Sequence, residues 1–558
     1  MFSGAINLIR AFFWTCWDQG IRRAIVLTLD RFRSLARGRG QFIRHPRYPS
    51  NAFSYLPHLP YRPLISVVLP AIESPYLHET VESVLAQSYK NFELLIVDGG
   101  AKTLADFKDQ RIRAIPRPAV DGTAHAHAVN AGIAAATGEY VTTLNADDLF
   151  HPDALALIVR TMNQGEPYDI FFSDEGPMDA AGKLTAWLRK GPVSMDLLLS
   201  CNPVLHLWMI RRESLERIGM MNPEFEGSHD HDLFIRACEN GLRFCHVPCS
   251  IYAWRKPAPP AVDSPAYQNG KKAIHAYLAR HGIKAAVTDD GHPWYRVKYE
   301  LPADAGEVAV IVPFRDKPEY LQRLLSSFEK TRYPKYKLVL VNNRSEQAAT
   351  KQFLAQARNN PRVEVVDFDE PFNFSRLHNQ VVARIPNELL LFLNNDMEII
   401  QPDWLEAMLE HIHRDRVAAV GCRLVRPDGS LQHAGMSFQP TILSCVCNME
   451  KDDGFYTRVQ RDISGVTAAC MLIRKSVFLK VGGFDEIHFP IGFGDADLCL
   501  KIVQAGYKII YTPFARLVHH ESVSRKTQDE SYEIFNLFRR FIGITPMRDR
   551  HYKSLFTT

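Results

Sequence analysis

ISVVLP at residues 65–70 and VAVIVP at residues 308–313 are two short apolar runs that each end in proline. Each is followed by a stretch with a helical pattern, HETVESVLAQSY or EYLQRLLSSFEK, and then by a second apolar run, LLIV at 94–97 or LVLV at 338–341. Apolar runs that alternate with helices are typical of parallel strands buried on both faces of a sheet. The sequence therefore predicts an α/β fold.

The chain contains this arrangement twice. Five pairs of matching segments follow each other in the same order in the two halves, with an offset that drifts only from 243 to 265 residues. The pairs are the two runs above, YKNFELLIVD (89–98) and YPKYKLVLVN (333–342), LNAD (144–147) and LNND (393–396), DHDL (230–233) and DADL (495–498), and GLRFCHVP (241–248) and GYKIIYTP (506–513). Ordered repetition of this kind predicts one fold used twice.

Proline-containing stretches separate the parts of the chain, and they lie at 46–63, 256–268 and 302–306. The mass of 63.5 kDa suits two large domains. The expected boundaries are a basic, helical N-terminal segment with a linker over residues 1–62, a first domain over 63–300, a second domain over 301–530, and a helical C-terminal tail over 531–558.

Charge is distributed unevenly along the 558 residues. The net charge of +4 is too weak to indicate nucleic-acid binding, so we expect no nucleic-acid partner. Residues 1–62, however, carry ten arginines, no lysine and two aspartates, and they include the apolar stretch AINLIRAFFWTCW at 5–17. An apolar stretch flanked by arginines is typical of a helix that lies on an anionic membrane, and residues 1–45 would make that contact. It is equally typical of a helix packed on the first domain.

The composition indicates a globular protein from a reducing compartment. Hydrophobic residues make up 46% and charged residues 23% of the chain, which argues against a fibrous or low-complexity protein. The sequence has no run of 18 or more apolar residues, and its ten cysteines form no C-x-x-C pair. We therefore expect a cytoplasmic protein, with peripheral contact at the inner face of the plasma membrane as a further option.

Acidic and amide side chains follow an apolar run in each half, in TLNADD (143–148) and FLNNDM (392–397). The carboxyl ends of parallel strands form the ligand-binding edge of an open α/β sheet. Closely spaced oxygen ligands at this edge suit a hard divalent cation, Mn²⁺ or Mg²⁺, that also holds a diphosphate. The same residues are common in turns and helix caps, so it is the repetition that favours a functional interpretation.

A second acidic pair precedes a helical pattern in each half, in GSHDHD (227–232) and GFGDAD (492–497). An aspartate in this position is commonly an N-cap. A carboxylate carried on a glycine-containing loop above the sheet edge can also act as a general base. In this interpretation Asp230 and Asp495 face the cleft, while the second aspartate of each pair caps the helix.

Taken together, these motifs resemble those of inverting family-2 glycosyltransferases with the GT-A nucleotide-sugar-binding fold, in the tandem arrangement of bacterial O-antigen and capsule glycosyltransferases. The resemblance covers about residues 63–530. In the first half it depends on SVLAQSY (83–89), NADD, FFSDE (171–175), FEGSHDHDL (225–233) and YAWR (252–255). In the second half it depends on PFNFS (371–375), Asn379, FLNND, PDGSLQHAG (427–435), VTAACMLIRKSVF (466–478), VGGFDE (481–486), DADLCLK (495–501) and YTPFARLVHHESVSR (511–525). It implies two tandem GT-A-like domains, each with a mostly parallel sheet flanked by helices.

The resemblance also assigns roles to residues of this chain. The catalytic bases would be Asp495 and Asp230, and the ligands of a divalent metal would be Asp396, His519 and Asp147. The substrate-binding residues would be Asp98, Asn342, Asn145, Asn394 and Asp148. The implied reaction transfers a hexosyl or deoxyhexosyl group, with inversion, from a nucleotide-sugar donor to a glycan or lipid-linked glycan acceptor.

This sequence departs from the family pattern at several of these positions. Asn342 stands where the family has an aspartate at the nucleotide base, and Asn145 and Asn394 replace the first acid of the Asp-x-Asp motif. An amide oxygen can still accept a hydrogen bond, but without the help of a charge. Ala253 stands where relatives of the first half carry a histidine, so we expect the first half to have lost a metal or diphosphate ligand.

Two interpretations follow from these departures. Each domain adds a sugar to a growing surface polysaccharide, or only the second domain is catalytic and the first is a glycan-binding or scaffolding pseudoenzyme. A nucleotide-dependent oxidoreductase is disfavoured, because neither VVLPAI nor VIVPFR carries the G-x-G-x-x-G that should follow the first strand.

Overall fold

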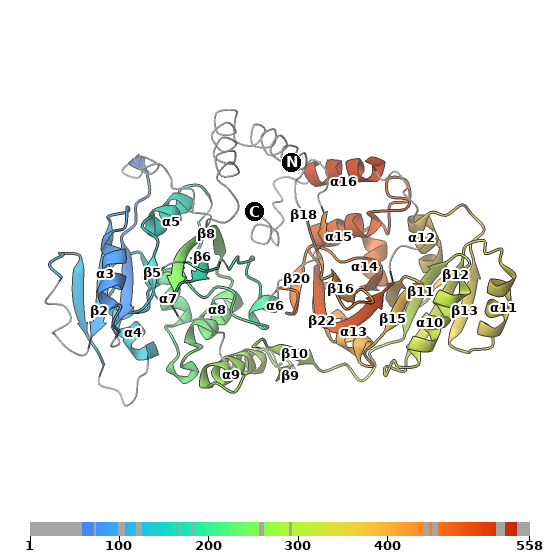
Figure 1. The fold of residues 1–558 in the computed structure, drawn as a ribbon, viewed down its shortest axis with the longest axis horizontal. Coiled ribbons are helices and arrows are strands. Elements are labelled where there is room, and N and C mark those ends of the chain that lie inside the picture. The colour runs from blue at the N-terminus through green and yellow to red at the C-terminus, as the bar shows by residue number, and fades with distance from the viewer. Residues whose placement is uncertain are drawn as a thin grey trace.

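The computed structural model describes residues 58–71, 74–98, 107–118, 125–165, 167–179, 182, 184–186, 188–255, 262–289, 293–438, 446–448, 456–520 and 531–543. They form two α/β lobes that lie side by side (Figure 1). We refer to the lobe around the first sheet as the first domain and to the lobe around the second sheet as the second domain. The expectation for residues 1–45 lies outside the described residues.

The first domain is built on an eight-stranded sheet with the order β3-β2-β1-β4-β7-β6-β8-β5. The pairs among β1 to β4 are parallel, as is β6 with β8, whereas β7 and β5 pair antiparallel with their neighbours. The strands are β1 (Ile65–Pro70), β2 (Phe92–Asp98), β3 (Ile112–Pro116), β4 (Tyr140–Thr143), β5 (Leu149–Phe150), β6 (Ile170–Pro177), β7 (Trp208–Arg211) and β8 (Phe244–Trp254).

Helices cover both faces of this sheet, because successive buried residues of a strand point to opposite faces. In β1, Val67 packs in the core under α3 (Leu77–Leu85) and α5 (Ala154–Met162), while Val68 packs in the core under the helices of the other face. The helices of that other face are α4 (His125–Ala135), α7 (Arg212–Ile218), α8 (His229–Glu239) and α9 (Pro265–Arg280). A short 3-10 helix, η2 (Pro223–Phe225), precedes α8.

The second domain repeats this plan with a ten-stranded sheet. Its main order is β13-β12-β11-β14-β21-β16-β22-β15, with β17 paired to β16 and β20 paired to β22. The strands are β11 (Val308–Phe314), β12 (Tyr336–Asn342), β13 (Val363–Asp367), β14 (Leu389–Leu393), β15 (Met397–Ile399), β16 (Val417–Val425), β17 (Leu431–His433), β20 (Arg461–Ile463), β21 (Cys470–Arg474) and β22 (Lys508–His519). The short strands β18 (Met436–Phe438) and β19 (Val446–Asn448) form a separate pair.

Helices again cover both faces of the second sheet. One core contains residues of α10 (Pro318–Phe328), α11 (Ala348–Ala357) and α13 (Trp404–Ile412). The other contains residues of α12 (Phe374–Arg384), α14 (Lys475–Lys480), α15 (Gly494–Gln504) and α16 (Ser531–Gly543). The α/β class and the tandem arrangement predicted from the repeat are thereby confirmed.

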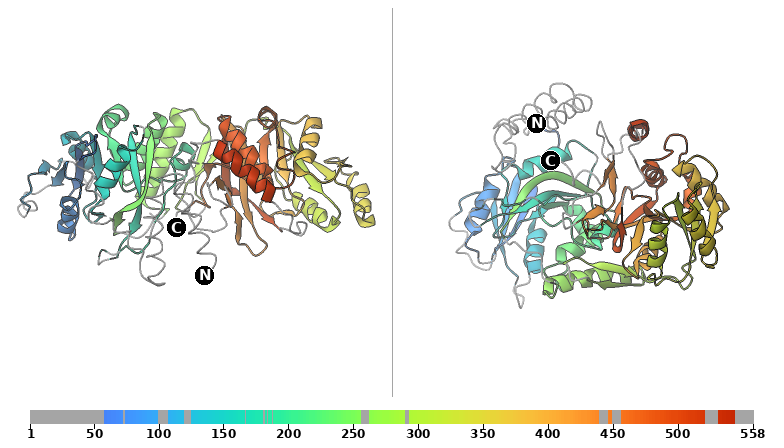
Figure 2. Two further views of the ribbon diagram at one scale, coloured as in Figure 1. Left: turned by 90° about the horizontal axis from the view of Figure 1, so that it is seen from above. Right: turned by 45° about the vertical axis from the view of Figure 1, so that its right-hand side comes forward.

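The two domains share a polar and apolar interface. It is crossed by α6 (Met195–Leu198) and by the hairpin of β9 (Ala285–Thr288) and β10 (Arg296–Tyr299), which lie between the lobes (Figures 1 and 2). Asp196 on α6 is 4% exposed and pairs with Arg414 and, at 3.1 Å, with Lys508 of the second domain. Leu197 and Cys201 belong to the same hydrophobic core as β14 and β21.

Two further expectations concern the C-terminal tail and membrane-spanning helices. The C-terminal tail contains the helix α16, which lies against α15 of the second domain (Figure 1). Among the helices of the described ranges, none combines the length and the apolar character needed to cross a bilayer.

Candidate functional site

The carboxyl edge of the second sheet brings three predicted residues together. Asn394 follows β14, Asp396 precedes β15, and His519 ends β22, where it pairs in register with Met397. The Nε2 atom of His519 lies 3.2 Å from Oδ1 of Asp396 and 3.4 Å from Nδ2 of Asn394. The acidic motif and the C-terminal histidine, 123 positions apart in the sequence, therefore form one site.

A glutamine fixes the orientation of this histidine. Oε1 of Gln432, on β17, lies 2.8 Å from Nδ1 of His519, which is 9% exposed. An amide oxygen only accepts hydrogen bonds, so Nδ1 carries the proton in this contact and Nε2 can face Asp396 with its lone pair. The motif PDGSLQHAG thus supplies the support for the histidine, a role that was not predicted.

Asp396 and His519 fit a divalent cation. Oδ1 of Asp396 is buried and has no hydrogen-bond partner among the described residues, although Nε2 of His519 lies beside it. Within the described ranges, no group of three or more His, Cys, Asp or Glu side chains could enclose a metal by itself. Two protein ligands at the sheet edge would leave the other positions of a cation to the oxygens of a diphosphate and to water.

The candidate base Asp495 lies in the first turn of α15 and is connected to the acidic motif through Ala468 and Ala469. Its Oδ2 accepts a hydrogen bond from the backbone N–H of Ala468 at 3.0 Å, and Oδ1 accepts from the N–H of Ala496 at 2.8 Å. The neighbouring carbonyl oxygen of Ala469 accepts from the backbone N–H of Asn394 at 3.0 Å. Asp495 and the acidic motif therefore flank the same dipeptide.

The second aspartate of each pair does not cap its helix, and this expectation was wrong. The N-cap positions are Ser228 in the first domain and Phe493 in the second. Asp232 is 2% exposed and pairs with Arg236 at 2.7 Å. Asp497 is fully buried and pairs with Lys501 at 3.0 Å and with Arg540 of α16. These carboxylates are held by cations because an unpaired buried charge would be costly.

The helix α16 also holds the loop in front of the candidate base. The carboxylate of Glu533, which is 6% exposed, accepts hydrogen bonds from the backbone N–H groups of Ile491 at 2.8 Å and Gly492 at 3.0 Å. Asp485 pairs with Arg540 on the same helix and with His488. Burial alone would raise the pKa of Asp485, but its hydrogen bonds to His488 and Ile487 and the charge of Arg540 lower it.

The predicted nucleotide-base residues lie at the ends of β2 and β12. Asp98 ends β2, but its side chain lies outside the described part of the chain. Nδ2 of Asn342 donates to Oδ1 of Asp367 at 2.8 Å, and Oδ1 of Asn342 accepts from the N–H of Ser345 at 3.1 Å. Asp367 ends β13, so the structure places a carboxylate beside Asn342 that the sequence did not reveal.

In the first domain, the acidic motif is arranged differently. Asp148 is 4% exposed and accepts hydrogen bonds from Nδ2 of Asn145 at 2.9 Å, from the hydroxyl of Tyr252 at 2.6 Å and from the N–H of Arg255 at 3.2 Å. Burial raises the pKa of this carboxyl group. Asp147 is partly exposed, and its carbonyl oxygen accepts from Nε of Arg255 at 3.0 Å. Asp148 is thus engaged within the protein, whereas Asp147 is the more accessible carboxylate.

The strand register corrects the position assigned to the missing histidine. The N–H of Phe150 contacts the hydroxyl of Ser83 at 3.3 Å, and the N–H of Ile399 contacts that of Ser327 at 3.1 Å, so Phe150 and Ile399 are equivalent. Their strand partners are Tyr252 and Leu517.

Counting two residues onward from these partners pairs Trp254 of the first domain with His519 of the second. Ala253 is the counterpart of Val518, so it does not occupy the place of His519. The part of the expectation that set Ala253 in the place of His519 was therefore wrong by one position, because the strand ends were aligned without their register.

The candidate base of the first domain, Asp230, is held as its counterpart is. It lies in the first turn of α8, and its Oδ1 accepts from the N–H of His231 at 2.8 Å. Its Oδ2 accepts from Nδ2 of Asn202 at 3.1 Å, while the amide oxygen of Asn202 accepts from the N–H of Val204 at 3.1 Å. As in the second domain, the loop before the antiparallel strand holds the base.

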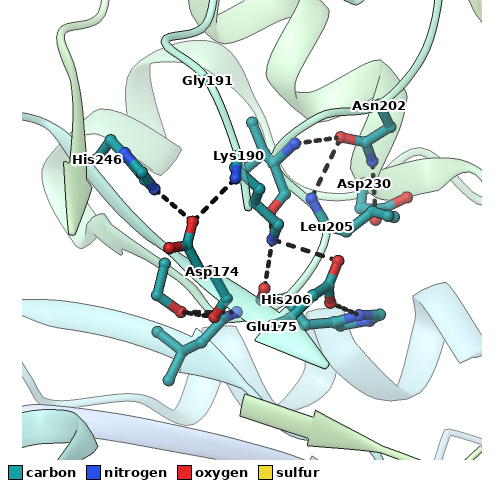
Figure 3. A network of polar contacts seen from close by, with 12 residues as sticks. Asp174, Glu175, Lys190, Gly191, Asn202, Leu205, His206, Asp230 and His246 are labelled. Atoms are coloured by element: carbon teal, nitrogen blue, oxygen red, sulfur yellow. Dashed lines mark hydrogen bonds and ion pairs between the residues drawn. The ribbon is translucent and has the colours of Figure 1, made fainter. Parts of the chain in front are cut away.

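A buried ionic network beside Asp230 was not predicted (Figure 3). Glu175, at the end of the FFSDE motif, contacts His206 at 3.3 Å and Lys190 at 3.4 Å. Burial alone would raise the pKa of Glu175, but Lys190 and His206 hold it below its usual value. Burial alone would lower the pKa of His206, but the contact with Glu175 and the charges of Asp148 and Asp230 raise it.

The comparisons with known proteins identify the family of the chain. Residues 66–219 and 309–482, together more than half of the chain, match the family described as "Glycosyl transferase family 2". The chain belongs to glycosyl transferase family 2. Both matches begin in the first strand of a sheet, and each includes the acidic motif and the antiparallel strand of its domain.

Two relatives extend over most of this family member. It is 33% identical over 540 residues to the O-antigen biosynthesis protein RfbC of Myxococcus xanthus, an alignment that covers 92% of this chain and 42% of the relative. It is also 33% identical over 492 residues to an uncharacterized protein of Sinorhizobium fredii, covering 84% of this chain and 54% of the relative. The chain thus spans about half the length of these curated relatives.

Among solved structures, one similar chain is GalNAc-T7 in complex with UDP, GalNAc and Mn²⁺. The TM-score is 0.37 at 15% identity, and the superposition covers 51% of this chain and 58% of that chain.

Proposed function

We propose that this chain is a glycosyltransferase that moves hexosyl or deoxyhexosyl groups, with inversion, from nucleotide-sugar donors to a growing, lipid-linked surface polysaccharide. The observation that carries the proposal is the position of Asp495. Its carboxylate is tied to the dipeptide Ala468–Ala469, whose other end binds the asparagine of the acidic motif. A base connected in this way to a candidate diphosphate site would serve transfer to an acceptor hydroxyl, and this connection supports the proposal.

The chemistry assigned to each group follows from its type. A bound divalent cation, Mn²⁺ or Mg²⁺, would offset the charge of the diphosphate leaving group. Asp396 and His519 would hold that cation, with Asn394 beside them. Asp495 would take the proton from the acceptor hydroxyl as the oxygen attacks the anomeric carbon opposite the diphosphate, and attack from that side inverts the configuration.

At the nucleotide, two neighbouring residues would contact the base in the second domain. Asn342 keeps an accepting amide oxygen, and Asp367 supplies the negative charge that Asn342 lacks. In the first domain, Asp98 at the end of β2 would have the corresponding role. The acidic motif there would contribute Asn145 and Asp148 to substrate binding and Asp147 to the metal, with Asp230 as base.

Donor hydrolysis and transfer by the full chain, measured with a panel of nucleotide sugars, test this function. We expect one donor to be turned over in the presence of Mn²⁺ or Mg²⁺. NMR of the product should show an anomeric configuration opposite to that of the donor. Turnover without any divalent cation would contradict the role of Asp396 and His519. Retention of the anomeric configuration would contradict a direct attack of the acceptor oxygen opposite the diphosphate.

A second candidate function is favoured by the register at His519. Because Trp254 occupies the equivalent position, the first domain lacks the strand histidine. In this alternative only the second domain is catalytic, and the first is a glycan-binding or scaffolding pseudoenzyme. Asp495→Asn in the full chain separates the two functions, because it should remove all transfer in the alternative and only one of two transfers in the bifunctional enzyme.

We also propose that residues 1–45 bring the enzyme to the inner face of the plasma membrane, where a lipid-linked acceptor would be presented. The support is the sequence alone, in which residues 1–62 contain ten arginines and two aspartates. Deletion of residues 1–45 should lower binding to vesicles that contain anionic lipid. Unchanged sedimentation with these vesicles would contradict the proposal.

A further inference from the structure

His206 of the first domain lies as close to the asparagine of its acidic motif as His519 lies to that of the second. The Nε2 atom of His206 lies 3.4 Å from Nδ2 of Asn145, and Nε2 of His519 lies 3.4 Å from Nδ2 of Asn394. The two asparagines are equivalent residues that follow β4 and β14. The two histidines, however, come from different parts of the fold.

The strand registers show which residue of the second domain is equivalent to His206. In β4 and β7, Tyr140 pairs with Arg211, and in β14 and β21, Leu389 pairs with Arg474. Counting back five residues from each arginine aligns His206 with Ala469.

The substitutions at the two positions are therefore reciprocal. The second domain has a histidine at the strand end and alanine in the loop, with His519 and Ala469. The first domain has a histidine in the loop and tryptophan at the strand end, with His206 and Trp254. Such an exchange leaves one imidazole beside the asparagine in each domain.

In both domains, a buried polar residue holds the other ring nitrogen. Nδ1 of His206 lies 3.3 Å from Oε2 of Glu175, as Nδ1 of His519 lies 2.8 Å from Oε1 of Gln432. Glu175 is 2% exposed and is itself held by Lys190, so its position is fixed by the fold (Figure 3). A partner on Nδ1 is the usual way in which proteins aim Nε2 of a histidine at a metal or a ligand.

The surrounding loop adds two constraints on His206. Its ring stacks on Tyr252, with the ring centroids 4.8 Å apart and an interplanar angle of 15°. The same loop is tied to the candidate base, because Nδ2 of Asn202 donates to Asp230. The imidazole is therefore carried by the loop that also binds the base, between the acidic motif and the start of α8.

We propose that His206 is the metal or diphosphate ligand of the first domain, in place of the strand-end histidine, with Glu175 as its positioning residue. This inference rests on the proposed glycosyltransferase function. It gives the candidate site of the first domain the histidine that its strand end lacks. It removes the reason for treating that domain as a pseudoenzyme. The strand end had suggested that the ligand was lost, whereas the geometry supplies it from the loop before β7.

The test measures Mn²⁺ directly in the full chain, in the presence of inorganic pyrophosphate, by electron paramagnetic resonance of the free ion. Asp396→Asn weakens the site of the second domain, so that the first domain dominates the titration. In this background His206→Ala should lower Mn²⁺ affinity at least 10-fold, because losing even a supporting partner of a metal ligand costs about 10–100-fold. His281→Ala, whose side chain is 42% exposed and pairs with Glu239, is the matched control and should have no effect.

A folded His206→Ala chain with unchanged Mn²⁺ affinity overturns the inference and leaves His206 with a structural role. His206→Gln provides a second variant should the alanine destabilise the loop. The unaltered chain offers an independent measurement, in which Mn²⁺ with pyrophosphate should protect His206 from carbethoxylation by diethyl pyrocarbonate, read by mass spectrometry. Equal modification with and without the ligands contradicts the proposal.

These outcomes are distinct from failure of the proposed function. If the unaltered chain turns over a nucleotide sugar but His206→Ala leaves first-domain Mn²⁺ binding intact, only the role of His206 fails. If the unaltered chain neither binds Mn²⁺ with pyrophosphate nor turns over any donor, both proposals fail.

Discussion

The Oδ2 atom of Asp495 lies 3.0 Å from the backbone nitrogen of Ala468. This contact fixes one carboxylate oxygen on the segment that leads into β21, while the helix N-terminus supplies the N–H of Ala496 to the other oxygen at 2.8 Å. Both oxygens retain lone pairs, since each carboxylate oxygen accepts about two hydrogen bonds. The carboxylate is therefore held in place without losing its capacity to accept a proton.

The first prediction concerns this carboxylate. Asp495→Asn keeps an oxygen that can accept from Ala468 but cannot take the acceptor proton, so second-domain transfer should fall about 10²–10⁴-fold. Donor binding, measured by calorimetry on the full chain, should stay within a few-fold of the unaltered value. Asp415→Asn, at an exposed turn before β16, is the control. Near-normal turnover would mean that another group is the base.

The second prediction concerns Gln432. Gln432→Leu has nearly the same size but cannot accept the proton of Nδ1, so the ring of His519 loses the contact that orients it. Mn²⁺ affinity of the second-domain site should fall about 10–100-fold, as is usual for the loss of a partner behind a metal ligand. Gln322→Leu, on the exposed side of α10, should change nothing. An unchanged affinity would show that packing alone orients His519.

The third prediction concerns the domain interface. Asp196→Asn removes the buried charge that pairs with Arg414 and Lys508, and it leaves these two partly buried cations without their counter-ion. Breaking a buried ion pair typically costs about 3–5 kcal/mol. Urea unfolding should start at lower denaturant and separate into two transitions, because the domains would lose their coupling. Asp304→Asn, with its side chain 82% exposed, is the control, and an unshifted transition would contradict the prediction.

Much of the fold and part of the site could be predicted from the sequence. The apolar runs LLIV and LVLV gave β2 and β12, because fully buried parallel strands leave an uninterrupted apolar signature. The order of the repeated motifs then placed Asp396 and Asp495 at one edge. Both inferences depend on local pattern and on the direction of strands, which a sequence displays.

The rest depended on register and on contacts between distant segments. Whether Ala253 or Trp254 faces the acidic motif changes with a shift of one residue along β8, and that shift leaves no local signature. His206 contacts Asn145, which lies 61 positions away in the sequence. A lone histidine belongs to no periodic pattern, so the sequence did not reveal this contact. The boundaries of the two domains remain predictions.

The fourth prediction concerns pH and Glu410, on α13 at the interface with the β9–β10 hairpin. Glu410 is 4% exposed, and burial raises its pKa to about 7, although Arg296 lies 3.5 Å away. The folded state then holds a proton that the unfolded state has released, so this group makes stability fall as pH rises from about 4.5 to 7.

Glu410→Gln removes this charge and should therefore stabilise the chain by about 1–3 kcal/mol at pH 8 and by clearly less at pH 5, where the folded carboxyl is neutral. Urea unfolding at the two pH values measures the difference. A stabilisation equal at both pH values would mean that the gain comes from packing, and a loss at pH 8 would mean that the ion pair with Arg296 outweighs burial.

The last prediction concerns Glu533 of α16. Its carboxylate accepts hydrogen bonds from the N–H groups of Ile491 and Gly492, just before the helix that carries Asp495. Glu533→Gln weakens both hydrogen bonds, because a neutral acceptor replaces a charged one. The loop should then shift enough to lower second-domain kcat about 10–100-fold, since displacements near 1 Å can cost that much. Mn²⁺ affinity should be unchanged, because the hydrogen bonds and ion pairs of α16 in the described part of the chain reach residues 485–492 and Asp497 rather than Asp396 or His519. This distinguishes the variant from Gln432→Leu. Tyr532→Ala, 58% exposed on the same helix, should leave both quantities unaltered. Loss of metal binding together with kcat would show that α16 supports the whole domain rather than the loop of the base.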